Sequence, residues 1–362
     1  MKRKKNSINI FTIGDKGDYD SHNKLNREAN FTRKQGFNYE TRQYKEFLKG
    51  RLPELESNKI IIFPFFPFKY WNKFIENREY RGLYGNLTFY HKFNRFCKEM
   101  ALSVKKHYPG KKVLYINDPV LSSEYRDKKT VLDVLKRSGI KVPSTIKTRS
   151  VKEIKEMLEK GKKLFIKPRC GSMGKGITYL ELGNWQTNFG LKKEKIISRR
   201  SDHGWRFRDE TGNNVFLRKL LSYKDLLIEE AIDPLHIRGD KVDFRVYVFF
   251  DKVLYVYPRR NNAESVTTNI SQGGRGAPGL LKVIPKDMLT RIEKTAKKAL
   301  KALDLKLAGI DVIVSGDLKD VYVIDVNMFP GFPKVRTCNI AQRMIRELKR
   351  LDRAGKLRYS SL

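Results

Sequence analysis

From about residue 140 onward, short apolar segments alternate with turns and with longer segments of helical spacing. The apolar segments are residues 164–167, 177–182, 226–230, 244–250, 254–257, 309–314 and 321–326. Residues 151–158 and 287–303 have apolar side chains at helical spacing. Because several neighbouring apolar segments are joined by short loops, we expect largely antiparallel sheets. The sequence therefore predicts an α+β fold for this part of the chain.

The preceding part of the chain has a different pattern. Residues 59–63 and 112–116 are expected to be buried strands, and residues 87–107 have apolar side chains at helical spacing. We predict a smaller α/β domain over residues 59–120. Residues 1–58 are polar and turn-rich without strong periodicity, and we interpret them as a basic N-terminal arm or an irregular cap.

Two further boundaries follow from the distribution of charge. Residues 183–223 are expected to be an insertion, and residues 337–362 a basic C-terminal helix. The basic residues of the insertion are Lys192, Lys193, Lys195, Arg199, Arg200, Arg206 and Arg208. A patch of this kind would suit an anionic substrate.

A glycine-rich segment follows the apolar segment that ends at Lys167. Its residues are Gly171, Ser172, Met173, Gly174, Lys175 and Gly176. Glycines let the backbone approach a ligand and present successive N–H groups to phosphate oxygens, and Lys167 would add a positive charge. No helix and no GK[ST] ending follow, so this is not a Walker A loop. The segment is either a phosphate-binding loop or a solvated glycine-rich hairpin.

Two carboxylates and an amide lie on neighbouring apolar segments near the C-terminal end. Asp311 belongs to one segment, and Asp325 and Asn327 belong to the next. Because side chains alternate along a strand, Asp325 and Asn327 share one face and both could reach one ion. Oxygen ligands of this kind suit Mg²⁺, whereas a solvated sheet face would fit less well with such apolar strands. With the glycine-rich segment, these residues predict a site for a nucleoside triphosphate.

The order and spacing of these motifs resemble the ATP-grasp superfamily over residues 118–335. Within that superfamily the sequence is most similar to alpha-L-glutamate ligase-like and glutathione synthetase-like proteins. The resemblance implies an ATP-grasp domain over residues 121–336, in which two α+β subdomains grip ATP. The smaller α/β domain would precede it.

The resemblance assigns the residues that would bind ATP. Lys128 stands eleven residues before Gly139, as the family's first phosphate-binding lysine does before a turn, and Lys167 matches the second lysine. Residues 171–176 match the flexible loop that folds over the triphosphate. The hinge whose backbone contacts the adenine edge corresponds to Glu229, Glu230, Ala231 and Ile232. Either Asp233 or Asp243 would meet the ribose, and the spacing leaves both open.

The resemblance also implies catalytic and metal-binding residues. The segment that begins at Asp243 (D-F-R) is similar to a strand of alpha-L-glutamate ligases. A later segment repeats their "RR…N…GG" spacing. The implied catalytic residues are Arg245, Arg260 and Asn269, with both arginines stabilising charge on the transferring phosphoryl group. The implied metal ligands, for one or two Mg²⁺ ions or alternatively Mn²⁺, are Asp311, Asp325 and Asn327.

Amino-acid composition indicates which substrate and which cellular location suit this site. The chain has 76 Lys and Arg residues against 40 Asp and Glu residues, a net charge of +36, so we expect an anionic second substrate. Nucleic acid is an alternative partner. The three cysteines show no metal-binding spacing, which favours a cytoplasmic protein without structural zinc. No apolar segment is long enough for a membrane span, and the oligomeric state stays open.

Aromatic side chains form two further groups. Residues 63–71 are rich in Phe and Tyr, and we interpret them as core of the first domain rather than as a ligand site. Trp185, Trp205 and Phe207 interleave with the basic residues of the insertion. Core packing is the favoured interpretation there too, with stacking on a base as the alternative.

Three functions remain open at this point. The first is an ATP- and Mg-dependent carboxylate–amine ligase acting through an acyl phosphate, which the spacing of residues 243–274 favours. The second is a kinase that phosphorylates a polyanionic acceptor such as an inositol phosphate. The N-M-F-P-G-F segment that begins at Asn327 resembles the inositol trisphosphate kinase branch of the superfamily. The third is a nucleic-acid-binding ATP-grasp protein, against which the intact ATP and metal residues argue.

Overall fold

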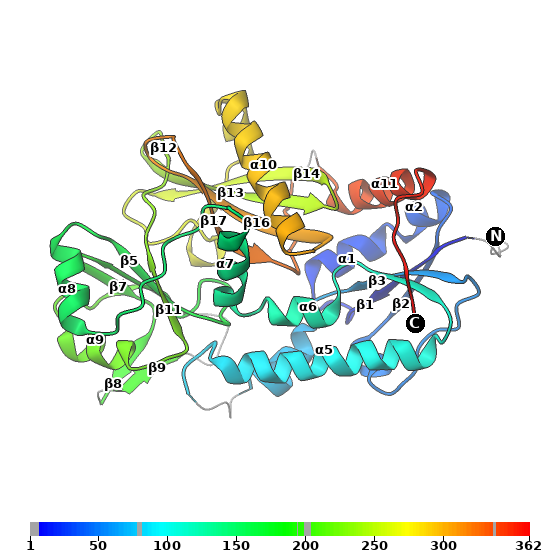
Figure 1. The fold of residues 1–362 in the computed structure, drawn as a ribbon, viewed down its shortest axis with the longest axis horizontal. Coiled ribbons are helices and arrows are strands. Elements are labelled where there is room, and N and C mark those ends of the chain that lie inside the picture. Colours follow the sequence, from blue (N-terminus) through cyan, green and yellow to red (C-terminus); the bar gives the residue numbers. More distant parts are fainter. Residues whose placement is uncertain (1–6, 78–81, 194, 199–203, 336–337) are drawn as a thin grey trace.

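The structure is a computed structural model that describes residues 7–77, 82–193, 195–198, 204–335 and 338–362. Three larger sheets and a two-stranded hairpin organise these residues (Figure 1). The first sheet belongs to the N-terminal domain, and the other two face each other across the candidate site. Among the described residues, no helix is both long and apolar enough to cross a membrane.

The N-terminal sheet has the strand order β18-β4-β3-β1-β2 and is parallel except for β18. Its strands are β1 (Asn9–Ile13), β2 (Asn38–Arg42), β3 (Lys59–Pro64), β4 (Lys112–Tyr115) and β18 (Ser360–Ser361). Its helices are α1 (Asp20–Arg27), α2 (Ala29–Lys34), α3 (Tyr44–Phe47), α4 (Phe68–Tyr70), α5 (Leu87–His107), α6 (Pro119–Glu124) and α11 (Ile340–Arg353). The π-helical turn Trp71–Ile75 precedes α5. The strands expected at 59–63 and 112–116 and the helix expected at 87–107 are therefore confirmed.

The interpretation of residues 1–58 as an arm or cap was wrong for the described residues. Strand β1 lies between β2 and β3, and all five of its residues are buried. A parallel strand that is buried on both faces reads as a short apolar run without alternation. In β1 this run is also interrupted by the buried polar side chains of Asn9 and Thr12. The segment therefore contributes the middle of the N-terminal sheet.

The middle sheet is antiparallel and has the strand order β10-β7-β6-β5-β11. Its strands are β5 (Leu164–Pro168), β6 (Thr178–Glu181), β7 (Asn184–Thr187), β10 (Arg208–Asp209) and β11 (Leu226–Glu230). The accompanying elements are α8 (Val151–Glu159), α9 (Asn214–Leu221) and the hairpin strands β8 (Gly190–Lys192) and β9 (Lys195–Ile197).

The expected insertion at 183–223 proves to be part of this middle sheet. Strand β7 pairs with β6, β10 pairs with β7, and α9 buries four apolar side chains. Within the proposed patch, Arg206 and Arg208 are exposed, whereas Arg199 and Arg200 lie outside the described residues. The segment was interpreted as an insertion into the α+β arrangement, but the apolar residues between its charges pack into the domain.

The C-terminal sheet is antiparallel and has the strand order β15-β14-β13-β16-β17, with β12 paired to β13. Its strands are β12 (His236–Ile237), β13 (Asp240–Phe249), β14 (Lys252–Asn262), β15 (Arg275–Gly276), β16 (Leu307–Val314) and β17 (Val321–Asn327). Helices α7 (Lys128–Arg137) and α10 (Lys286–Ala302) and the short 3₁₀ helices Ile270–Gln272 and Pro278–Lys282 accompany them. Helix α10 repeats apolar residues at helical spacing and packs this face against the sheet, with Val131 and Leu135 of α7 in the same core.

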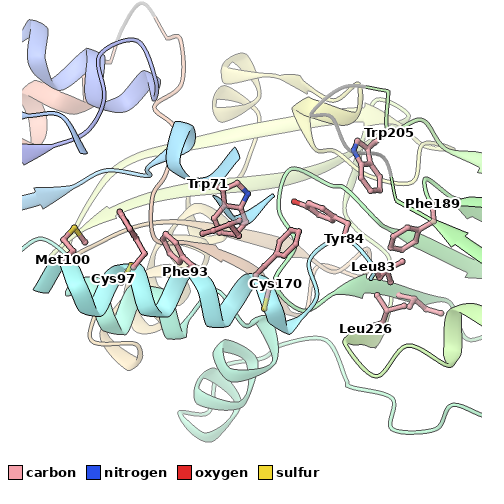
Figure 2. Close-up of a cluster of buried hydrophobic side chains, with 14 of the residues drawn as sticks. Trp71, Leu83, Tyr84, Phe93, Cys97, Met100, Cys170, Phe189, Trp205 and Leu226 are labelled. Atoms are coloured by element: carbon pink, nitrogen blue, oxygen red, sulfur yellow. The ribbon is translucent and has the colours of Figure 1, made fainter. Parts of the chain in front are cut away.

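A continuous apolar cluster joins the N-terminal domain to the middle sheet. Figure 2 shows Phe93, Cys97 and Met100 on helix α5 and Trp71 beside it, with Tyr84, Trp205 and Phe189 extending toward the middle sheet. The aromatic rings of Tyr84 and Trp205 have centroids 5.2 Å apart. Trp185 and Trp205 are buried, as the core interpretation predicted, whereas Phe207, the third residue of that prediction, is partly exposed. This packing fixes the N-terminal domain against the segment that carries the glycine-rich loop.

The basic C-terminal helix is present as α11, and one of its faces is apolar. Ile340, Met344, Ile345 and Leu348 are buried in a core that also contains residues of β1 and β13. After α11 the chain returns to pair β18 with β4. The helix is therefore a structural part of the N-terminal domain, with its basic residues on the remaining face.

His22 of α1 gives the fold an expected pH dependence. Its ring is buried near Phe65, and burial lowers its pKa from 6.5 to about 4, although a hydrogen bond with the backbone of Asp15 opposes the shift. Between these two pH values the unfolded chain takes up a proton that the folded chain does not. The free energy of unfolding should therefore fall as the pH drops from about 6.5 to about 4, by up to about 3 kcal/mol, and His22 should contribute no further loss below that.

Urea unfolding across this pH range measures the effect. His22→Gln should flatten the slope, and His91→Gln, which changes an exposed histidine on α5, serves as the matched control. An unchanged slope in the His22 variant would contradict the assignment.

Candidate active site

A cavity of about 1360 Å³ lies between the middle and C-terminal sheets and extends to the N-terminal domain. Strands β5, β6 and β11 line one side, and β13, β16 and β17 line the other. Most residues predicted for the site line this cavity. They are Lys128, Lys167, Gly171, Ser172, Met173, Gly174, Lys175, Glu229, Glu230, Ala231, Ile232, Asp233, Asp243, Arg245, Asn269, Asp311, Asp325 and Asn327. Gly176 and Arg260 are not among the lining residues.

The two predicted phosphate-binding lysines are each held by a carboxylate. Lys128 Nζ lies 2.5 Å from Asp325 Oδ1, and Lys167 Nζ lies 2.5 Å from Glu229 Oε2. Lys128 is at the start of α7, where Asp127 caps the helix by accepting a hydrogen bond from Lys129. The other carboxylate oxygen of Glu229 is buried and has no hydrogen-bond partner in the described structure. An unpaired buried acceptor beside the hinge is suited to a ligand that donates a hydrogen bond, as an adenine amino group does.

The glycine-rich loop is held against the N-terminal domain. The Lys175 ammonium lies 2.7 Å from Glu76 and 4.9 Å from the ring centroid of Tyr84, and the lysine side chain is buried. The hydroxyl of Tyr84 lies 3.2 Å from the Ser172 hydroxyl. The Lys175 ammonium, which the resemblance places in the loop over the triphosphate, is therefore paired with Glu76.

The loop geometry explains its glycines. Gly174 and Gly176 have φ values of 67° and 72°, in the left-handed region that favours glycine. A Cβ at Gly176 would lie 2.7 Å from the Phe189 ring, so this glycine serves close packing. On the other side, the Ser271 hydroxyl donates to the Met173 carbonyl at 2.6 Å. Asn269 accepts a hydrogen bond from the Ser271 amide, which places the predicted catalytic asparagine next to the loop.

A buried network of charges occupies the face of the C-terminal sheet toward the cavity. Arg245 Nε and Nη2 each donate to the carboxylate of Asp311 at 2.7 Å. Arg259 donates to both oxygens of Asp243 and lies 3.2 Å from Asp311. Burial alone would raise the pKa of Asp311, but the charges of Arg245 and Arg259 outweigh it and hold this pKa below its ordinary value. The carboxylate is therefore ionised at neutral pH.

The predicted catalytic position Arg260 needs correction, because its neighbour Arg259 faces the cavity. Strand pairing sets Asp243 opposite Arg259 and Val242 opposite Arg260, and side chains alternate between the two faces. Arg260 is half-exposed and pairs with Asp240 at 3.2 Å, away from the cavity lining. The motif has two adjacent arginines, and the register of β13 with β14 decides which of them points inward.

The structure also distinguishes Asp233 from Asp243, the two candidates for the ribose contact. Asp243 is buried, and both of its carboxylate oxygens already accept from Arg259, so it is held within the sheet. Asp233 follows the hinge, lines the cavity and is largely exposed, with one oxygen 2.9 Å from Lys163. The geometry favours Asp233.

The three predicted metal ligands lie together on β16 and β17. Asp311 is the cross-strand partner of Asp325, and Asn327 shares a strand face with Asp325. No cluster of three His, Cys, Asp or Glu suited to a metal occurs among the described residues, so the amide is needed as the third donor. The donors are all oxygen atoms that line the cavity, which fits Mg²⁺. Lys128 and the two arginines neutralise the carboxylates in this structure.

Several residues that shape the cavity were missed from the sequence. Glu76 and Tyr84 act through partners that are distant along the chain, and no local pattern identifies them. Arg259 belongs to the recognised pair of arginines, but only the strand pairing shows that it faces the cavity. The interpretation of residues 63–71 as core was wrong in part. Phe63, Phe65 and Trp71 are buried, whereas Phe66 and Phe68 are partly exposed and line the cavity together with Tyr19, Arg126 and Phe329.

Two facing α+β subdomains with a glycine-rich loop and paired lysines between them define the ATP-grasp fold. Residues 117–351 match the sequence model of the family described as YheC/D like ATP-grasp, and the chain belongs to this family. A RiPP-associated ATP-grasp ligase from Chryseobacterium gregarium, solved with ADP and a leader and core peptide, has the same fold. That structure has a TM-score of 0.59 and 14% identity, over 98% of this chain and 99% of the other.

Two curated relatives are also similar. A tetrahydromethanopterin:alpha-L-glutamate ligase from Methanocaldococcus jannaschii is 30% identical over 217 residues, which cover 59% of this chain and 62% of that protein. A probable alpha-L-glutamate ligase from Ectopseudomonas mendocina is 25% identical over 253 residues, covering 67% of this chain and 69% of the relative. The first match thus spans less than two thirds of the relative's own length.

Proposed function

We propose that the protein is an ATP- and Mg-dependent carboxylate–amine ligase that acts through an acyl phosphate. The observation that carries this proposal is the single cavity in which Lys128 and Lys167 lie with Asp311, Asp325 and Asn327 beneath the glycine-rich loop. The ligase names of the relatives support this choice of reaction. The first step would transfer the γ-phosphoryl group of ATP to a carboxylate, and the second would let an amine displace phosphate to form an amide.

Each group of residues has a role in this scheme. Lys128 and Lys167 neutralise the phosphates of ATP, and the hinge residues 229–232 hold adenine, with Asp233 near the ribose. Residues 171–176 cover the triphosphate, and Asn269 supports this loop through Ser271. Asp311, Asp325 and Asn327 would hold Mg²⁺, which supplies neutralisation of phosphate charge. Arg245 holds Asp311 in place, and Arg245 and Arg259 would stabilise charge on the transferring phosphoryl group, with Arg259 in place of Arg260.

The second substrate, the metal ions and the cellular location complete the proposal. The net charge of +36 favours an anionic second substrate, whereas a nucleic acid has only the charge in its favour. One or two Mg²⁺ ions, or Mn²⁺, would fit the oxygen donors. The need for ATP and the three buried free cysteines favour a cytoplasmic location.

A screen for ADP release tests the reaction. The purified protein is given MgATP with amino acids and peptides, with inositol phosphates, or with RNA. We expect release of ADP and inorganic phosphate that requires both a carboxylate and an amine. Hydroxylamine in place of the amine should trap the acyl phosphate as a hydroxamate. A phosphorylated acceptor formed without release of phosphate would instead identify a kinase.

A further inference from the structure

One end of the cavity lies at the carboxyl ends of the parallel N-terminal strands. Tyr19 follows β1, Phe66 and Phe68 follow β3, and Arg126 follows β4 and α6. Ligands commonly bind at the carboxyl ends of parallel strands, where the following loops converge. The cavity volume of about 1360 Å³ exceeds the range of roughly 300–1,000 Å³ that is typical of one small ligand. Space for a second molecule therefore remains beside ATP.

An aromatic wall lines this end of the cavity, formed by Tyr19, Phe66, Phe68 and Phe329. The Phe66 ring is central, with centroid distances of 6.0 Å to Tyr19 and 5.8 Å to both Phe68 and Phe329. All four side chains are partly exposed. A half-buried aromatic surface of this kind offers a flat apolar group the edge-to-face and offset contacts that rings prefer.

The wall is held in place by hydrogen bonds to the segment after β17. The Tyr19 hydroxyl donates to the Phe329 carbonyl at 2.5 Å, and the Ser21 hydroxyl donates to the Pro330 carbonyl at 3.0 Å. The Tyr247 hydroxyl donates to the Gly331 carbonyl at 2.8 Å. A surface fixed from both domains needs little ordering when a ligand binds.

Arg126 is the positive charge at this end of the cavity. Its guanidinium stacks on Trp71, with 4.9 Å to the ring centroid, and lies 5.8 Å from that of Phe66. It donates one hydrogen bond, to the Cys170 carbonyl at 3.1 Å, and its Nε is buried without a partner in the described structure.

Most cations that line the cavity are paired with a carboxylate. Lys128, Lys167, Arg245 and Arg259 each pair with one, whereas no acidic side chain of the described residues pairs with Arg126. Lys241, which also lines the cavity, likewise has no such pair among the described residues and donates to the Ser265 carbonyl. An arginine that is preorganised by stacking and lacks an internal counterion is suited to an external carboxylate or other anion.

We propose that this end of the cavity binds the second substrate, which presents a flat apolar group to the aromatic wall and a carboxylate to Arg126. This inference rests on the proposed ligase function and specifies its substrate class. A small hydrophilic amino acid alone would fit this end of the cavity less well, because four partly exposed aromatic rings would give it no favourable contact.

Three probes separate the two parts of the proposal. N-acetyl-L-phenylalanine has the ring and the carboxylate, N-acetyl-L-alanine has only the carboxylate, and N-acetyl-L-phenylalaninamide has only the ring. Binding of each to the full chain is measured by calorimetry in the presence of ADP and Mg²⁺. The aromatic acid should bind about tenfold more tightly than either other probe, because each lacks one contact.

Variants then assign the contacts to residues. Arg126→Gln should weaken binding of the aromatic acid about 10- to 100-fold and leave binding of the amide and of ADP within about twofold. Arg126→Lys should retain part of the affinity because it keeps the charge. Phe66→Leu should remove the preference for the phenylalanine probe over the alanine probe. Arg137→Gln, which changes an exposed arginine of α7, is the matched control and should change nothing.

Other outcomes would overturn the proposal. Equal affinity for the alanine and phenylalanine acids would exclude the aromatic wall as a binding surface. A loss of ADP affinity in Arg126→Gln would assign the arginine to the nucleotide, and absence of binding by the aromatic acid would exclude the substrate class. Because these measurements need no turnover, their failure is distinguishable from failure of the ADP-release screen.

Discussion

Asp325→Asn should reduce ATP turnover at least about 100-fold while the fold stays intact. Asp325 lies opposite Asp311 across β16 and β17 and faces the cavity, where it holds Lys128 at 2.5 Å. The substitution keeps the shape of the side chain and removes the charge that the proposed Mg²⁺ site and Lys128 require. Loss of one preorganised electrostatic partner typically costs 100- to 1,000-fold in rate. ADP release at saturating ATP measures the effect.

A control for this substitution is available on the same hairpin. Asp320 pairs with Lys141 at 2.5 Å, as Asp325 does with Lys128, but this pair is exposed and lies outside the cavity lining. Asp320→Asn should retain full turnover. Thermal unfolding of both variants should give midpoints within a few degrees of the unchanged protein, since neither pair is fully removed from solvent. Turnover retained by Asp325→Asn would exclude the metal assignment.

The ion pairs within the cavity predict that ATP and Mg²⁺ bind cooperatively. Lys128, Lys167 and Arg245 are paired with Asp325, Glu229 and Asp311 in the structure. The same lysines are proposed to bind phosphates, and two of the same carboxylates are proposed to bind Mg²⁺. Binding would therefore break these ion pairs, because the lysines would contact the phosphates and the carboxylates would contact the metal. Binding of ATP without the metal would leave Asp325 unpaired beside the phosphates, so the two should bind cooperatively.

Sequence patterns predicted local parts of the fold and missed the long-range ones. The hairpin of β16 and β17 and helices α5, α8 and α10 were found because their periodicity is contained in a single segment. Strand β1 was missed because it is short and is buried on both faces between strands that come later in the chain. Pairing of parallel strands depends on segments that no local window contains.

In the site, too, local features were predicted and long-range ones were missed. Lys128, Lys167 and Asp325 were predicted from motif spacing, and they line one cavity. The choice between Arg259 and Arg260 depended on strand register, which a shift of one residue reverses. Phe66 was assigned to the core because its neighbours are apolar, but it lies beyond the end of β3, where the chain turns toward the cavity.

Arg259→Met should destabilise the protein by about 3–5 kcal/mol. Arg259 is buried between Asp243 and Asp311, and both carboxylates would lose this counterion without gaining access to water. Removing one partner of a buried ion pair leaves an uncompensated charge, which is the source of the expected loss. Urea unfolding at pH 7 measures it. Arg260→Met removes the adjacent, half-exposed arginine and should change the stability by less than about 1 kcal/mol.

A double variant separates the electrostatic cause from loss of packing. Asp243→Asn in the Arg259→Met background removes the charge that has lost its counterion, whereas Asp311 keeps Arg245, so it should recover part of the lost stability. The same Asp243→Asn change in the unaltered protein should be destabilising, because it weakens an intact pair with Arg259. The change in unfolding free energy caused by Asp243→Asn should therefore have opposite signs in the two backgrounds, which is specific to a charge network. If Arg259→Met and Arg260→Met were equally mild, the buried network would not hold β13, β14 and β16 together, and the correction from Arg260 to Arg259 would lose its physical basis.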